Sequence, residues 1–135
     1  MRTVSKTVIG VDFGTQSARA VLVNAENGEI IYSCRKEYPY NSTPVPAIDC
    51  AENLPCATDY EMTLYELLRN VIPEEYRKTV AGICVDATSL TMVLLAEDGR
   101  ALSELDGWSE AAHARVKLWK YHRAQEKADE ALNLA

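Results

Sequence analysis

The sequence lacks any run of about 18 apolar residues, the length that a membrane-spanning helix needs, and its first residues contain no apolar signal-peptide core. It also lacks an excess of positive charge: 14 Lys and Arg stand against 20 Asp and Glu, so the formal net charge is -6. Nucleic acids and anionic membranes attract basic surfaces. We therefore expect no nucleic-acid partner, no membrane partner and a cytoplasmic location.

The sequence also lacks Cys and His residues at the spacing that structural metal sites use. The chain has four cysteines and two histidines, but no Cys-x-x-Cys pair, and the histidines lie far from the cysteines. This argues against a structural zinc site and favours reduced, partly buried thiols. Two common phosphate-binding signatures are absent as well, the Walker A loop with its Gly-Lys-Ser/Thr and the Gly-x-Gly-x-x-Gly fingerprint.

One stretch near the start, residues 9–23 (IGVDFGTQSARAVLV), has the pattern of a strand, a tight turn and a second strand. Asp12 ends the first strand, Gly14 and Thr15 occupy the turn, and Arg19 lies near the start of the second strand. A carboxylate can hold a hydrated cation, while turn N–H groups and a Thr hydroxyl can meet phosphate oxygens. The alternative is an ordinary hairpin, because Asp and Gly are common in turns.

The rest of the chain predicts one α/β domain with a mixed five-stranded sheet and flanking helices. Its 47% of hydrophobic residues suffice for a sizeable core. Besides the hairpin, three segments have strand composition: 29–38, 79–85 and 91–96. The apolar run 79–85 predicts a strand buried on both faces, and the turn ending at Gly28 predicts that 29–38 is antiparallel to the strand before it.

Two helices are expected. Thr58 and Glu61 fit a capping box at the start of the first, which Pro73 ends, and its apolar stripe comprises Leu64, Leu68, Val71 and Ile72. The second is expected from about Ser109 to the end of the chain, because this segment has no Gly or Pro and its apolar residues step by three or four. The proline-containing segment 39–55 is expected to be a loop.

Three segments together resemble one family. Asp12-x-Gly14-Thr15-x-x-x-Arg19 is similar to the first phosphate motif of the superfamily that contains actin and the sugar kinases. Residues 82–92 (GICVDATSLTM) resemble the strand and loop that touch the sugar in FGGY carbohydrate kinases. Residues 116–125 (VKLWKYHRAQ) resemble a helix start of the ribulokinase branch, and Tyr121 stands where other FGGY kinases more often have Asp. The resemblance implies a ribonuclease-H-like domain of the actin type.

The resemblance implies an activity and a set of site residues. The activity is ATP-dependent phosphorylation of a ketopentose, L-ribulose to L-ribulose 5-phosphate, with ATP and Mg²⁺ as cofactors. Contacts with the nucleotide phosphates are implied for Asp12, which would hold Mg²⁺ through water, and for Gly14, Thr15, Gln16 and Arg19. Contacts with the sugar are implied for Asp86, Thr88, Ser89, Trp119 and Lys120. The alternatives for the sugar contacts are turn capping, turn hydrogen bonding, core packing and a surface lysine.

The family's sequences are several times longer than this chain, so residues 1–135 correspond to an incomplete N-terminal domain. In the family, the general-base aspartate and the adenosine site lie in the part of the sequence that follows the segment matched by this chain. We therefore expect no catalytic residue in this chain, and no activity from it alone. The open-ended final helix pattern favours a fragment over a stand-alone, non-catalytic sugar- or phosphate-binding module. A kinase for xylulose, ribitol or glycerol is a further alternative. The missing domain, or a second copy in a homodimer, would cover the exposed apolar face.

Overall fold

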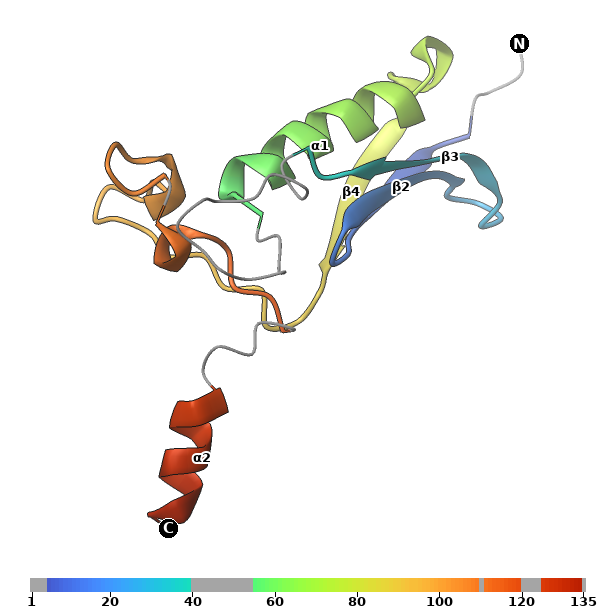
Figure 1. Cartoon of the computed structure of the whole chain (residues 1–135). Coiled ribbons are helices and arrows are strands. Elements are labelled where there is room, and N and C mark those ends of the chain that lie inside the picture. The colour runs from blue at the N-terminus through green and yellow to red at the C-terminus, as the bar shows by residue number, and fades with distance from the viewer. Residues whose placement is uncertain (1–4, 40–54, 110, 120–124, 135) are drawn as a thin grey trace.

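The structure is a computed structural model that describes residues 5–39, 55–109, 111–119 and 125–134. Its centre is a four-stranded sheet in the order β3-β2-β1-β4. β1 is antiparallel to β2 and parallel to β4, so the sheet is mixed. Helix α1 lies along one face of this sheet (Figure 1). The bounds of these elements are β1 Thr7–Phe13, β2 Ser17–Asn24, β3 Ile30–Glu37, α1 Ala57–Val71 and β4 Val80–Ala87.

The core lies between the sheet and α1. Alternate residues of β1, Ile9 and Val11 among them, are buried toward α1, and they pack with Leu67 and Val71 of the helix. The small side chains of Ala18 and Ala20 and the larger Leu22 bring β2 into the same cluster. The residues between them point to the other side of the sheet, which we call the open face.

Helix α1 confirms the predicted helix but corrects its cap. The helix begins at Ala57 with Cys56 as N-cap, and the Cys56 N–H donates a 2.8 Å hydrogen bond to Asp59 Oδ2. The expected capping residue, Thr58, lies inside the helix and its hydroxyl bonds to Glu104 instead. The sequence pattern is ambiguous because Asp59 can take the capping role for a helix that begins two residues earlier than one capped by Glu61. Of the predicted apolar stripe, Val71 is buried in the core, and Leu64, Leu68 and Ile72 pack partly buried against it. Leu67, which the predicted stripe did not include, is buried in the same core.

β4 confirms the predicted strand, but the expected burial on both faces is wrong. Ile83 and Val85 are 53% and 56% exposed. The physical reason is the position of α1, which packs over β2 and β3 and leaves β4 as an uncovered edge of the sheet in the described part of the chain. The continuous apolar run therefore predicted a strand correctly, but in the described structure this strand lacks the neighbours that would bury it.

The fifth strand and most of the final helix are corrected. Within the described residues, 91–96 forms no strand, only isolated bridges from Met92 to Lys117 and from Leu95 to Ala101. Residues 111–119 are not an α-helix, and α2 covers Gln125–Asn133 alone. The buried residues there are Ala114, Val116 and Leu118, which alternate with a period of two. Ala114 and Leu118 are also four residues apart, a helical spacing, which explains the wrong prediction.

Three short 3-10 helices complete the described secondary structure: η1 (Glu74–Tyr76), η2 (Leu102–Glu104) and η3 (Ala112–Ala114). The expected loop 39–55 lies almost entirely outside the described residues. Cys34, Cys56 and Cys84 are free thiols. Among the described helices, none combines the length and the apolar character needed to cross a membrane.

Candidate phosphate-binding site

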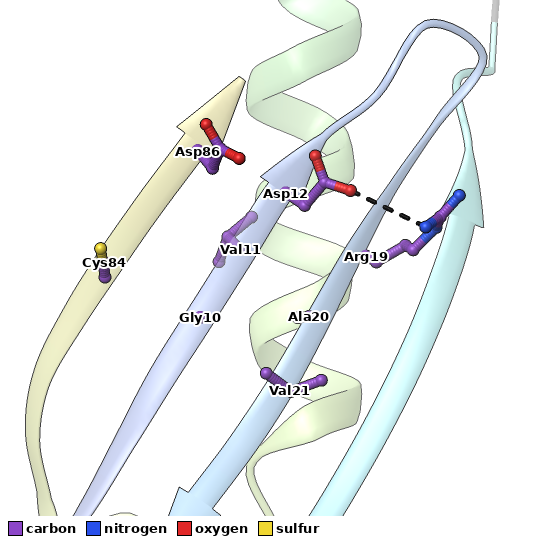
Figure 2. Close-up of a pocket in the computed structure, with 8 residues that line it drawn as sticks. All are labelled: Gly10, Val11, Asp12, Arg19, Ala20, Val21, Cys84 and Asp86. Atoms are coloured by element: carbon purple, nitrogen blue, oxygen red, sulfur yellow. Dashed lines mark ion pairs between the residues drawn. The ribbon is translucent and has the colours of Figure 1, made fainter. Parts of the chain in front are cut away.

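Two carboxylates lie next to each other at the carboxyl ends of the parallel strands β1 and β4. Asp12 and Asp86 are register partners, and both line a cavity of about 330 Å³ on the open face. Figure 2 shows the two side chains near the strand tips, with Arg19 of β2 beside Asp12. The Arg19 Nη1 lies 3.9 Å from Asp12 Oδ2. Ligands of α/β sheets bind outside the carboxyl ends of parallel strands, so this edge is the candidate site.

The turn between β1 and β2 is tight at Gly14. The Gly14 N–H donates a 3.1 Å hydrogen bond to the Ser17 carbonyl oxygen. A Cβ at Gly14 would lie 3.0 Å from that same oxygen, a tighter contact than nine in ten real Cβ atoms make. Gly14 is therefore required for close backbone approach and not for a left-handed conformation, because its φ is not positive.

Two hydrogen bonds donated by Tyr38 hold this turn in place. Its hydroxyl donates a 2.8 Å hydrogen bond to the Gly14 carbonyl, and its N–H donates to the Gln16 carbonyl at 3.3 Å. Burial, reinforced by nearby Tyr60 and Asp12, raises the pKa of Tyr38 well above its ordinary value. The hydroxyl therefore stays protonated and remains a donor at neutral pH. Two carbonyls of the turn are thus held in place, and the turn is preorganised.

A second cavity, of about 400 Å³, adjoins the turn. Its lining combines the turn with side chains from distant parts of the chain: Gly14, Thr15, Gln16, Ser17, Arg19, Arg35 and Trp119. Trp119 Nε1 donates a hydrogen bond to Thr15 Oγ1 at 3.2 Å, and Arg35 Nε donates to Ser17 Oγ at 3.0 Å. Hydroxyls, guanidinium groups and an indole face make this a polar cavity suited to an anionic ligand.

Comparison with known proteins gives a consistent picture, although no protein-family model matches the sequence. Ribulokinase 1 of Staphylococcus saprophyticus is 39% identical over 126 residues, which cover 89% of this chain and 23% of that protein. The ribulokinase of Mycolicibacterium smegmatis is 34% identical over 134 residues, 92% of this chain and 24% of that protein. The chain is ribulokinase-like. It spans about a quarter of the length of the curated relatives that it matches.

Two solved structures resemble the fold of this ribulokinase-like chain. They are a gluconate kinase and a ligand-bound xylulose kinase, both from Lactobacillus acidophilus. Each has a TM-score of 0.64 and 20% sequence identity, and each match covers 95% of this chain and 22% of the other. This confirms the expected α/β sugar-kinase fold, with four described strands in place of five.

The expected sugar residues of the ribulokinase-like chain are only partly brought together. Asp86 lies beside Asp12, and Trp119 reaches the turn at Thr15. Thr88 follows β4 directly, but its N–H and its hydroxyl both bond to the Phe13 carbonyl, at 2.9 and 3.1 Å. Ser89 is exposed, and Lys120 lies outside the described residues. The sugar contacts stay predictions.

The site contains residues that the sequence did not reveal. Arg35 and Tyr38 come from β3 and its end, and neither belongs to the phosphate motif. The predicted antiparallel pairing across the turn at Gly28 could have led to Arg35, because this pairing places Arg35 opposite Arg19. The sequence analysis predicted this pairing without its register, so it did not identify Arg35 as a neighbour of Arg19. In the described part of the chain, no group of three or more His, Cys, Asp or Glu side chains could hold a metal ion.

Proposed function

We propose that this chain, residues 1–135, is the incomplete N-terminal domain of a carbohydrate kinase that phosphorylates a ketopentose with MgATP. The sugar is L-ribulose and the product is L-ribulose 5-phosphate. The proposal is supported by the similarity to curated ribulokinases and by the phosphate-suited turn between β1 and β2. We assign the reaction to the cytoplasm, where ATP is available.

The observation that carries the proposal is the contact between Trp119 and Thr15. Trp119 belongs to the ribulokinase-like segment 116–125, whereas Thr15 belongs to the phosphate turn. The contact joins an aromatic side chain, which can pack against the apolar face of a sugar, to the turn that would hold the transferred group. Phosphoryl transfer depends mainly on positioning and charge neutralisation, so this proximity is what the reaction needs.

The donor set fits a hydrated Mg²⁺ and a phosphate chain. Asp12 would orient the water shell of the cation, which neutralises phosphate charge when it is bound. Gly14, Thr15 and Gln16 would face the phosphate oxygens, and Arg19 would contribute a guanidinium group while pairing with Asp12. Asp86, Trp119 and the segment 88–89 with Lys120 would face the sugar.

The general base that accepts the sugar proton is assigned to the missing part of the kinase, together with the adenosine site. The chain alone is therefore expected to show no turnover. That missing domain is also the partner that we expect to cover the open face.

The test joins this chain to the remaining three quarters of Ribulokinase 1 from S. saprophyticus in place of its matching segment. We expect ADP release that depends on both L-ribulose and Mg²⁺, and a loss of about a hundredfold or more in kcat for Asp12→Asn. Asp106→Asn, at an exposed Asp that lines neither cavity of the site, is the matched control and should leave kcat unchanged. A folded hybrid without ribulose-dependent turnover, or one insensitive to Asp12→Asn, would refute the proposal.

A further inference from the structure

Two arginines face each other across β2 and β3. Arg19 and Arg35 are register partners in this antiparallel pair, so their side chains lie on the same face of the sheet. Both line the cavity of about 400 Å³ beside the turn. Like charges placed directly opposite each other on neighbouring strands destabilise a sheet. The repulsion between the two arginines would be offset if both bound an anionic ligand.

The charge of this cavity is opposite to the charge of the chain. The formal net charge is -6, yet the described lining residues of the cavity include two arginines and no carboxylate. An acid outside the lining pairs loosely with each arginine: Asp12 Oδ2 is 3.9 Å from Arg19 Nη1, and Glu37 Oε1 is 3.7 Å from Arg35 Nη2. Exposed pairs at such distances contribute little. The formal charges among the described lining residues are therefore the two guanidinium groups, whose sign suits an anionic ligand.

The guanidinium of Arg35 is also oriented. Its Nε donates a hydrogen bond to Ser17 Oγ at 3.0 Å, and Ser17 is only 5% exposed at the base of the turn. The Arg35 side chain as a whole remains 57% exposed. One nitrogen is thus anchored to a buried residue, while the end of the guanidinium stays at the cavity. An anchored guanidinium loses less conformational freedom when it binds an anion.

We propose that Arg35 is a phosphate-binding residue, which together with Arg19 grips a terminal phosphoryl group of a polyphosphate chain in this cavity. The inference rests on the proposed function, because the turn at Gly14 must be the phosphate site. Arg35 adds to that site a second guanidinium, supplied by β3. The planar fork of each arginine matches two oxygens of a phosphoryl group, so the facing pair can hold one group from two sides.

The experiment is isothermal titration of the 135-residue chain with inorganic tripolyphosphate at low ionic strength. Arg35→Ala is expected to weaken binding by about tenfold or more, the value of one charge-assisted hydrogen bond. Arg35→Lys should recover part of the loss, because it keeps the charge and loses the fork. Lys36→Ala is the matched control: the neighbouring residue carries the same charge but pairs with Glu66 on the α1 side, 2.6 Å away. It should leave the affinity within about twofold.

Arg19→Ala distinguishes a failure of the role of Arg35 from a failure of the proposed phosphate turn. If Arg19→Ala weakens tripolyphosphate binding and Arg35→Ala does not, the inference about Arg35 is overturned while the phosphate turn stands. Equal losses for Arg35→Ala and Lys36→Ala would also overturn it, since general charge would then explain both. If the wild-type chain binds no tripolyphosphate, or binds it with no loss in either arginine variant, the proposed function of the turn fails together with the inference.

Discussion

The indole Nε1 of Trp119 donates a hydrogen bond to Thr15 Oγ1 at 3.2 Å, although the two residues are 104 positions apart. This contact ties the segment after η3 to the turn between β1 and β2. A substitution at Trp119 should therefore affect the turn at Thr15, and a substitution at Thr15 should affect Trp119.

The first prediction concerns this contact. Trp119→Phe keeps an aromatic wall but removes the indole N–H, so it should lower kcat/KM of the hybrid kinase severalfold, as the loss of one neutral hydrogen bond does. Trp119→Ala also removes the wall, and should raise the KM for L-ribulose by about tenfold or more. Steady-state kinetics measure both. Trp108→Phe, at the other tryptophan, is the control, and an equal effect there would refute the role of the contact.

The second prediction concerns the core under the sheet. Leu67 is buried in α1 against the strands, so Leu67→Ala should lower the free energy of unfolding by about 2–5 kcal/mol. Met62 on the same helix is 40% exposed, and Met62→Ala should cost no more than about 0.5 kcal/mol. Urea titration followed by circular dichroism compares the two. Similar midpoints would mean that α1 does not pack as described.

A third prediction separates the observed helix cap from the expected one. Asp59→Ala removes the carboxylate that accepts the Cys56 N–H, and should cost about 1–2 kcal/mol of stability. Thr58→Ala removes only an exposed hydrogen bond to Glu104 and should cost about 0.5 kcal/mol or less. Urea midpoints measure this difference too. A larger loss for Thr58→Ala would restore the capping box that the sequence suggested.

The fourth prediction is a pH dependence at high pH. Burial raises the pKa of Tyr60 from 10.0 to about 12. The folded state therefore disfavours the tyrosinate, so the stability contributed is complete below pH 10 and is lost as the pH rises from 10 to 12. The Tyr60 hydroxyl has no hydrogen-bond partner among the described residues, so Tyr60→Phe should cost little at pH 8.

Unfolding midpoints at pH 8 and pH 11 test this prediction. Tyr60→Phe should reduce the decline between the two values. Tyr65→Phe serves as control, because Tyr65 lies 58% exposed on the same helix, and its removal should leave the decline unchanged. A decline of full size in Tyr60→Phe would assign the effect to another group, with Tyr38 as the first candidate because burial raises its pKa as well.

The local part of the fold was predictable from the sequence because its signals are short-range. Asp12, the turn at Gly14 and the alternation along the two strands lie within 15 residues, and the register of the hairpin follows from its turn. The apolar run before Asp86 likewise indicated a strand without any knowledge of its neighbours.

The parts that were not predictable depend on partners far away in the sequence. Ala114 and Leu118 fit a helix by their spacing of four, but the backbone between them forms extended contacts: Val116 N–H bonds to the Pro55 carbonyl, and Lys117 pairs with Met92. In the same way, Arg35 enters the candidate site only through the pairing of β3 with β2. Composition along one segment carries no information about which distant backbone will complete its hydrogen bonds.

The uncovered edge at β4 also bears on how this chain will behave at the bench. Its outer backbone groups pair with no other strand in the described structure, and Ile83 and Val85 lie exposed along it. An apolar, unprotected strand of this kind is a template for further strands, so protein concentration will determine how long a sample stays monodisperse. Ile83→Lys places a charge on that edge, and should keep concentrated samples free of fibrous or amorphous precipitate for longer.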